Sequence, residues 1–255
     1  MHPLNYINKV SNIADTPLLA GAISKAEEII LVGHINPDGD SIGSLMGMKG
    51  YLETLGKKVT PTVPNPYPEF LGFLDLEKEV LAYSEEPQAI EEKVKDAQLI
   101  ICMDFNSLKR IDSLGEIIAD AAAEKALIDH HPQPDTIFNI VYSYPQMSST
   151  CELTYWVLKD LVEILGGNIP MSSAIALYTG MMTDTNNFGN SVLPSTFRMA
   201  AELMEAGVDK EWIQKMVYGG YSADRMRLMG YMLYQNMKLI QEYNAAVIVI
   251  NKEIK

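Results

Sequence analysis

Four short segments of the chain carry side chains that bind divalent cations, and each of them ends a predicted strand or helix. They are residues 34–40, 103–104, 129–131 and 183–185, and together they contain five aspartates and three histidines. Carboxylate oxygens and imidazole nitrogens are the ligands of hard and borderline divalent cations, and no thiolate accompanies them here. The residue types therefore predict a two-metal hydrolase.

Strands and helices alternate through the first two thirds of the chain. The segments with the apolar pattern of buried parallel strands are 28–33, 58–63, 98–103, 125–128 and 138–142. Amphipathic or capped helices are predicted between them at 41–55, about 87–95 and 113–123. This alternation predicts an α/β fold with a doubly wound, mostly parallel sheet flanked by helices.

The predicted sheet would bring three of the four segments together. Ligands of open α/β sheets bind beyond the carboxyl ends of the strands, and residues 34–40, Asp104 and residues 129–131 all follow predicted strands. Each has a simpler interpretation when taken alone, because Asp38 and Asp40 are common turn and N-cap residues and Asp104 could cap the next turn. Their coincidence at one sheet edge favours a site.

The spacing within the segments suggests roles. Asp38 and Asp40 are separated by one glycine and can reach two ions a few ångströms apart. Because side chains alternate along a strand, His130 is expected to face away from Asp129 and His131, so that one histidine binds metal and the other faces substrate. Asp129 is then expected to orient an imidazole from behind the site.

The chain becomes helical after residue 148. Ser149 and Glu152 form a predicted capping box, and helices are expected after it at about 150–165, 170–183, 195–206 and 209–217. A final helix at 222–243 has near-heptad apolar spacing and is expected to connect domains and to offer a homodimer contact. A strand at 245–250 follows without a predicted partner. The predicted division is a catalytic domain at 1–221, a connecting helix at 222–243 and the first strand of another domain at 244–255.

Composition limits the partners and the location of the protein. Hydrophobic residues make up 47% and charged residues 21%, and the net charge of −13 opposes binding of long duplex nucleic acid. Cys102 and Cys151 lack metal-ligand spacing and are expected to be reduced, packed thiols. Neither a secretion signal nor an apolar run of about 20 residues is present, so no membrane contact and a cytoplasmic location are expected. His2 is expected to be uninvolved.

The four segments, in order, resemble the motifs of the DHH phosphoesterase family. The matching sequences are HINPDGDSIGS at 34–44, Asp104 at a strand end, DHH at 129–131 and TGMMTDTNNF at 179–188. The likeness is greatest to the small bacterial oligoribonuclease and phosphoadenosine-phosphate phosphatase branch. It is weaker to single-strand exonucleases, cyclic dinucleotide phosphodiesterases and family II pyrophosphatases.

The resemblance implies a ligand set for two ions. His34 and Asp38 would hold one ion, Asp40 and His130 the other, and Asp104 would bridge both. Ligation by oxygen and imidazole favours Mn²⁺, with Mg²⁺ as a substitute.

The resemblance also implies further site residues. Asp184 would complete the centre, although the sequence does not assign it to one ion. His131 would contact the scissile phosphate or protonate the leaving oxygen. Arg110, six residues after Asp104, is a candidate phosphate contact and equally a solvated or helix-capping arginine.

One departure concerns substrate recognition. Members of this branch carry a C-terminal domain with a glycine-rich GGGH segment and basic residues for the distal end of the substrate, and these 255 residues contain no such segment. Two interpretations from different classes follow. The first is a Mn²⁺-dependent phosphoesterase for short oligonucleotides or nucleoside 3',5'-bisphosphates, with a cyclic dinucleotide phosphodiesterase or single-strand exonuclease as alternatives. The second is a non-catalytic nucleotide-binding or metal-binding module. Every ligand position is filled, which favours the enzyme.

Overall fold

The computed structural model describes residues 16–220 and 222–251, so His2 lies outside the described part. The chain divides into two compact units, Met1–Ile213 and Gln214–Lys255. The candidate site residues all belong to the first unit. Among the described residues, no helix combines the length and the apolar character that crossing a membrane requires.

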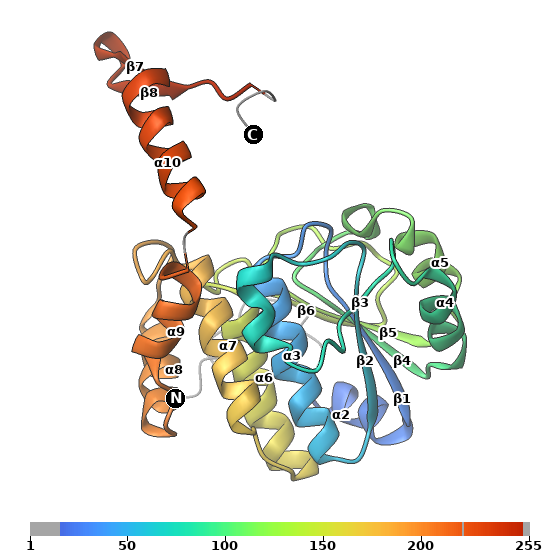
Figure 1. Cartoon of the computed structure of the whole chain (residues 1–255). Helices are drawn as coiled ribbons and strands as arrows, with labels where there is room; N and C mark the ends of the chain where they lie inside the picture. The colour runs from blue at the N-terminus through green and yellow to red at the C-terminus, as the bar shows by residue number, and fades with distance from the viewer. Residues whose placement is uncertain (1–15, 221, 252–255) are drawn as a thin grey trace. The chain divides into compact units, whose positions relative to one another are not determined.

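The first unit is built around a six-stranded sheet (Figure 1). Its spatial order is β3-β2-β1-β4-β5-β6, and every neighbouring pair is parallel. The strands are β1 (Glu28–Val32), β2 (Lys58–Val63), β3 (Leu81–Ala82), β4 (Leu99–Met103), β5 (Glu124–Asp129) and β6 (Ile140–Ser143). The expected doubly wound α/β fold is confirmed. The winding direction reverses between β1 and β4, which places a ligand crevice beyond the carboxyl ends of these two strands.

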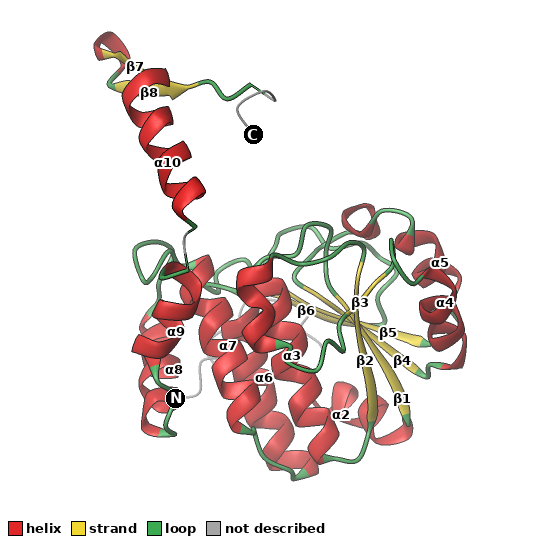
Figure 2. Ribbon diagram, in the orientation of Figure 1, coloured by secondary structure: helices red, strands yellow, loops and turns green. Residues whose placement is uncertain are grey.

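Helices α4 (Pro87–Asp96) and α5 (Leu114–Asp120) cover one face of the sheet (Figure 2). Ile90 and Ile118 from these helices join Ile30, Ile100 and Leu127 from the strands in one buried apolar cluster. The strands of this central region are buried on both faces, which explains their continuous apolar sequences.

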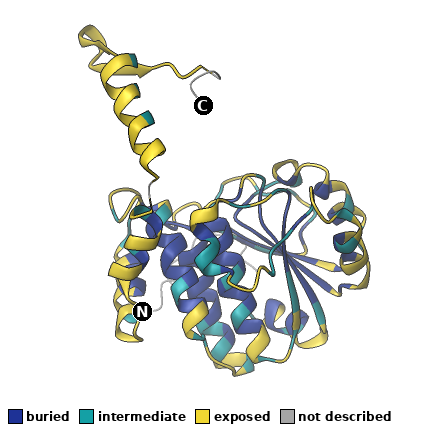
Figure 3. Cartoon of the chain, in the orientation of Figure 1, coloured by how far each residue is buried: buried dark blue, intermediate teal, exposed yellow. Residues whose placement is uncertain are grey.

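The other face is covered by α3 (Gly39–Thr54), α6 (Thr150–Leu165) and α2 (Thr16–Lys25), with α7 (Met171–Asp184) packed against α3 and α6. Figure 3 shows that most of α3, α6 and α7 is buried. Helices α3 and α7 approach closely, because a Cβ at Gly43 would lie 2.6 Å from the carbonyl oxygen of Ala176. This packing brings the first residues of α3 next to the last residues of α7.

The expected helices of the second half form α6, α7, α8 (Pro194–Glu205) and α9 (Lys210–Tyr218). Sequence patterns missed α2, β3 and two 3₁₀ helices, η1 (Glu69–Leu74) and η2 (Leu108–Ile111). Of these, β3, η1 and η2 are short, and a periodic pattern needs a longer window.

The second unit differs from the predicted connecting helix. Helix α10 (Ala223–Tyr231) is followed by a π-helical turn η3 (Met232–Asn236), strand β7 (Met237–Ile240), η4 (Gln241–Tyr243) and strand β8 (Ala245–Ile248). The prediction of one helix over 222–243 was therefore wrong beyond residue 236, and the strand after residue 244 has a partner. β7 and β8 pair antiparallel, and Asn244 turns the chain between them with a left-handed φ of 47°.

A local pairing explains this correction. The backbone groups of β8 need hydrogen-bond partners, and the preceding apolar residues supply them as a strand, although their spacing also fits a helix. The apolar side chains of α10, such as Met226 and Met229, are exposed within this unit. The three-part domain division and the homodimer contact stay predictions.

Candidate metal centre

The four segments singled out in the sequence converge at the carboxyl edge of the sheet. Among the described residues, three groups of side chains have possible ligand atoms within 4.8 Å of one another. The groups are His34, Asp38 and Asp104; Asp40, His130 and Asp184; and Asp104, His130 and His131. Asp104 and His130 each belong to two groups, so the groups form one continuous cluster.

His34, two residues after the end of β1, has its ring oriented by a hydrogen bond to the backbone. Its Nδ1 donates to the carbonyl oxygen of Ile35 over 2.8 Å, and because a carbonyl only accepts, Nδ1 carries the proton. Its Nε2 lies 3.3 Å from Asp104 Oδ2 and 3.9 Å from Asp38 Oδ1. The Nε2 atom and two carboxylates therefore face the same space, and a neutral imidazole protonated at Nδ1 would direct its lone pair there.

His130 is arranged in the same way. Its Nδ1 donates to the carbonyl oxygen of Met147 over 3.3 Å. Its Nε2 lies 3.8 Å from Asp40 Oδ2, 3.8 Å from Asp104 Oδ1 and 3.7 Å from Asp184 Oδ2. Ligand atoms that each lie about 2 Å from one ion are separated from each other by about 3–4 Å. The spacing thus fits a cation between these atoms.

The start of α6 positions the buried carboxylates, a role that sequence reasoning missed. The backbone N–H of Thr150 donates to Asp40 Oδ2 over 2.7 Å, and that of Cys151 donates to Asp40 Oδ1 over 2.8 Å. The Thr150 hydroxyl donates to Asp104 Oδ1 over 3.0 Å. The helix cap at Ser149 was predictable, but its proximity to residue 40 depends on how distant segments pack.

The capping box itself is only half formed. Ser149 Oγ accepts from the backbone N–H of Glu152 over 2.9 Å, as expected. The Glu152 carboxylate does not return to Ser149, and instead accepts from the N–H and the hydroxyl of Ser148 and from the hydroxyl of Thr196. Glu152 is fully buried, so it links the segment before α6 to α8.

Burial and mutual repulsion raise the pKa values of the clustered carboxyl groups. The pKa of Asp104 lies well above its ordinary range because the group is buried and faces Asp40 and Asp38. Burial also raises the pKa of Asp40, and burial with repulsion from Asp40 raises the pKa of Asp184 to about 7. Among the described residues, the ion-pair partners of these three aspartates are histidines. Buried carboxylates without a compensating cation are unfavourable, so the donor set fits Mn²⁺ or Mg²⁺.

Local backbone features show which of two aspartates acts as a helix cap and which does not. Asp38 is the N-cap of α3, because its Oδ1 accepts from the N–H groups of Asp40 and Ser41. Asp104 caps no helix, since Ser107 caps η2 with its own side chain. Asp104 also has a left-handed φ of 65°, a conformation that costs about 1–3 kcal/mol and is commonly retained at functional sites.

His131 lies at the edge of the cluster. Its Nδ1 donates to Asp129 Oδ1 over 2.7 Å, while the ring of His130 is turned toward the other carboxylates. The hydrogen bond to Asp129 raises the pKa of His131 despite its partial burial. Arg110 is exposed, acts electrostatically on His131, and accepts a backbone hydrogen bond from Ile35 over 2.8 Å. The chain thus places Arg110 beside the cluster.

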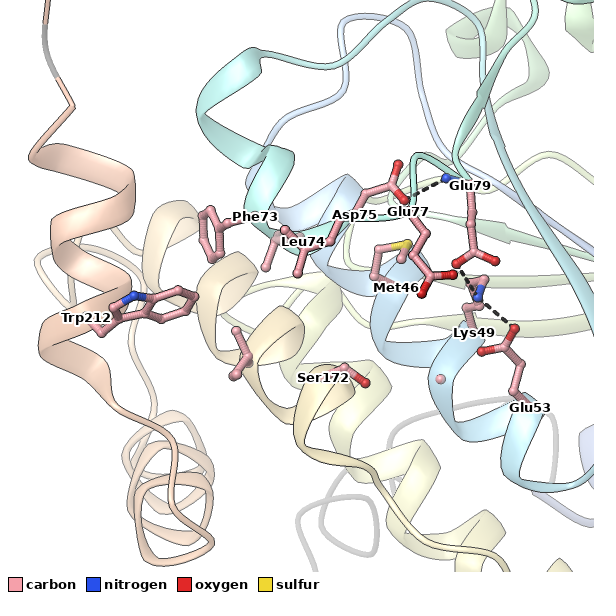
Figure 4. A pocket seen from close by; sticks show the side chains of 13 residues that line it. Met46, Lys49, Glu53, Phe73, Leu74, Asp75, Glu77, Glu79, Ser172 and Trp212 are labelled. Carbon is pink, nitrogen blue, oxygen red and sulfur yellow. Dashed lines mark hydrogen bonds and ion pairs between the residues drawn. The ribbon is translucent and has the colours of Figure 1, made fainter.

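A pocket of about 440 Å³ elsewhere in the first unit lacks these features (Figure 4). Two of its acidic side chains bind Lys49, whose Nζ lies 2.7 Å from a carboxylate oxygen of Glu53 and 2.7 Å from one of Glu79. Phe73 and Trp212 meet edge to face on its apolar side, with ring centroids 5.3 Å apart. No histidine is among its lining residues as described, and Glu53 and Glu79 already have Lys49 as their cation.

Fold and site together define a doubly wound α/β domain with a cluster of carboxylates and imidazoles, some of them buried, at its switch point. Residues 28–181 match the model of the DHH family, N-terminal domain. This match covers more than half of the chain, and the chain belongs to the DHH family. The resemblance found in the four motifs is confirmed.

The matches to named relatives cover most of this chain but only part of each relative's length. The chain is 32% identical over 193 residues to the bifunctional oligoribonuclease and PAP phosphatase NrnA of Thermus thermophilus, covering 74% of this chain and 54% of that protein. It is 27% identical over 237 residues to the Bacillus subtilis protein of the same name, covering 92% and 70%. It is 24% identical over 231 residues to the cyclic-di-AMP phosphodiesterase PdeA of Listeria monocytogenes, covering 85% and 34%.

Solved structures agree with the fold. An exopolyphosphatase-related protein from Bacteroides fragilis has a TM-score of 0.89 at 36% identity, covering 96% of this chain and 72% of that one. The exonuclease RecJ bound to manganese has a TM-score of 0.51 at 17% identity, covering 84% and 59%, and this likeness concerns the fold alone.

Proposed function

We propose that the chain is a two-metal phosphoesterase that uses Mn²⁺, with Mg²⁺ as a substitute, to hydrolyse short oligonucleotides or nucleoside 3',5'-bisphosphates. The observation that carries the proposal is the position of Asp104. Its two oxygens face different histidines, since Oδ2 lies 3.3 Å from His34 and Oδ1 lies 3.8 Å from His130. A carboxylate placed in this way can bridge two cations.

The two groups around Asp104 give the proposed ligand sets. His34 and Asp38 would hold one ion, and Asp40, His130 and Asp184 the other, which assigns Asp184 to the second ion. Bound divalent ions supply a low-pKa water and stabilise charge on phosphoryl oxygens. Two backbone amides of α6 donate to Asp40, and backbone carbonyl oxygens accept from His34 and His130. These hydrogen bonds keep the protein ligands oriented.

His131 is the proposed proton donor. Its Nδ1 is engaged by Asp129, so Nε2 is left to meet the substrate, and the raised pKa favours the protonated imidazole. In that state Nε2 can donate to the oxygen of the leaving group. Arg110 is the proposed contact for a nonbridging phosphate oxygen, because it is exposed beside His131.

The proposed substrate class draws support from charge and from relatives. The net charge of −13 disfavours long polyanions, whereas one or two phosphates can be held by ions and a single arginine. Relatives named as oligoribonucleases, PAP phosphatases and a cyclic-di-AMP phosphodiesterase all act on short phosphoesters according to their names. A cyclic dinucleotide is therefore the second candidate substrate.

The test is a substrate comparison with purified protein in Mn²⁺. A dinucleotide, phosphoadenosine phosphate, a cyclic dinucleotide and pyrophosphate are assayed side by side, and bound metal is quantified. We expect two Mn²⁺ ions per chain and turnover of the dinucleotide or the bisphosphate. Metal binding without turnover of any phosphoester would support the non-catalytic module instead.

A further inference from the structure

A pocket of about 410 Å³ opens directly from one end of the candidate metal centre. His130 and Asp184 are among its lining residues, whereas Asp38, Asp40 and Asp104 are not. The pocket therefore adjoins the second proposed ligand group and extends away from the rest of the cluster. Its volume lies within the range of pockets that bind small molecules, about 300–1,000 Å³.

The pocket beyond His130 and Asp184 is uncharged. Its walls combine hydrogen-bonding and apolar side chains from two loops, and the residues that matter are Gln146, Met147, Ser148, Ser191, Val192 and Leu193. No lysine or arginine is among its described lining residues, so nothing in it would balance a second phosphate group. A neutral group with polar edges and an apolar face suits this lining, as a base with its sugar does.

One buried carboxylate holds the two walls together. Glu152 Oε2 accepts from the hydroxyl of Ser148 over 2.5 Å and from the hydroxyl of Thr196 over 2.7 Å. Thr196 Oγ1 in turn accepts from the N–H of Leu193 over 2.9 Å, so both loops end at the same carboxylate oxygen. Because Glu152 is fully buried and hydrogen-bonded, the walls are fixed before any ligand enters.

The same wall is tied to the metal centre. The carbonyl oxygen of Met147, in the pocket lining, accepts the proton of His130 Nδ1. The position of the pocket wall and the orientation of a proposed metal-binding imidazole are thus set by one segment.

We propose that this pocket binds the nucleoside next to the scissile phosphate, with Gln146 and Ser191 contacting polar edges and Val192 and Leu193 contacting the ring face. This inference rests on the proposed function, since it places a phosphoryl group at the adjoining ions. It assigns the uncharged group of the substrate to this pocket and a second phosphate to another side of the centre. Glu152 is a positioning residue that keeps the two walls in place.

The test measures binding, so it does not depend on turnover. Adenosine monophosphate, ribose 5-phosphate and inorganic phosphate are titrated calorimetrically into the Mn²⁺-loaded chain. We expect adenosine monophosphate to bind at least about tenfold more tightly than phosphate, with ribose 5-phosphate between them. Equal affinities of all three in a chain that binds Mn²⁺ would overturn the nucleoside pocket and leave the metal proposal intact.

Variants localise the effect. Gln146→Ala, which changes an exposed loop residue, and Val192→Trp, which fills the pocket, should reduce the preference for adenosine monophosphate to about threefold or less. Gln88→Ala changes an exposed glutamine on α4 and should keep the wild-type preference. Retention of the full preference in Gln146→Ala and in a folded, metal-binding Val192→Trp would overturn the assignment. A chain that binds no Mn²⁺ would contradict the proposed function and this inference with it.

Kinetics give a second readout. Both variants should raise KM for a dinucleotide while leaving KM for a small activated aryl phosphodiester within about twofold, because the small ester does not reach the pocket. Glu152→Gln should raise KM for the dinucleotide more than KM for the aryl phosphodiester. An equal loss on both substrates would assign these residues to general folding instead.

Discussion

Two acidic clusters of the first unit show opposite solutions to the same electrostatic problem. Around Lys49, Glu53 and Glu79 bind the ammonium group, and their hydrogen bonds raise the pKa of Lys49 although burial acts to lower it. At the sheet edge, Asp40 and Asp104 are more deeply buried and have raised pKa values, and their ion-pair partners among the described residues are histidines. The first cluster supplies its own cation, and the second has the charge and geometry to bind one.

The largest expected effect comes from removing the shared carboxylate of the second cluster. Asp104→Asn keeps the size of the side chain but removes the charge that two ions would share. We expect Mn²⁺ content to fall and kcat/KM to drop by more than about 10³-fold, the upper range for one fixed electrostatic group. Metal analysis and steady-state kinetics check this, with Asp120→Asn at the exposed end of α5 as the matched control. Wild-type metal content and rate in Asp104→Asn would remove the basis of the comparison.

The next effect separates the two adjacent histidines. His131→Ala should retain Mn²⁺ and slow hydrolysis by about 10²–10⁴-fold, the usual loss for a positioned acid. His130→Ala should lose metal, because its Nε2 faces Asp40, Asp104 and Asp184. Metal content of the two proteins decides between the roles, and loss of metal in His131→Ala alone would exchange them. The third side-chain group, which joins His131 to Asp104 and His130, makes this a real alternative.

A smaller effect concerns stability and pH. The pKa of Asp184 is raised to about 7 in the folded chain. Without metal, this group therefore contributes most to the free energy of unfolding below its unfolded-state pKa near 4, where it is protonated. That contribution is lost as pH rises through about 7. Mn²⁺ binds the ionised carboxylates and offsets this loss. The increase in unfolding free energy on adding Mn²⁺ should therefore grow between about pH 5 and pH 7.5, reaching about 2.7 kcal/mol at 100 times Kd. Urea unfolding with Mn²⁺ and with a chelator measures it, and a difference that shrinks with rising pH would contradict the prediction.

The smallest effect belongs to the cluster that carries its own cation. Lys49→Met should lower the free energy of unfolding by about 1 kcal/mol. The loss is small because both glutamates are partly exposed, so water can solvate their carboxylates when the ammonium group is removed. Mn²⁺ content and kcat should stay unchanged. Lys58→Met, which removes an exposed ion pair with Glu28, is the control and should change stability less. A large loss of metal in Lys49→Met would mean that the two clusters are coupled.

The sequence by itself determined the fold class and the members of the candidate site. Continuous apolar strands alternating with capped helices specify a doubly wound sheet, and that topology places the ends of β1, β4 and β5 at one edge. Residue types then identify His34, Asp104 and His130 as a cluster without any knowledge of distances. Local rules suffice here because strand ends in a parallel sheet are neighbours whatever the loops do.

Tertiary structure alone decided how that cluster is supported and where the second unit turns. The amides that hold Asp40 come from Thr150 and Cys151, 110 and 111 residues away, and Glu152 joins Ser148 to Thr196 instead of closing its predicted capping box. The helix expected to reach residue 243 gives way to a hairpin because β7 and β8 satisfy each other's backbone groups. Periodicity records which face of a segment is apolar, but hydrogen bonds between distant segments depend on the packing of the whole fold.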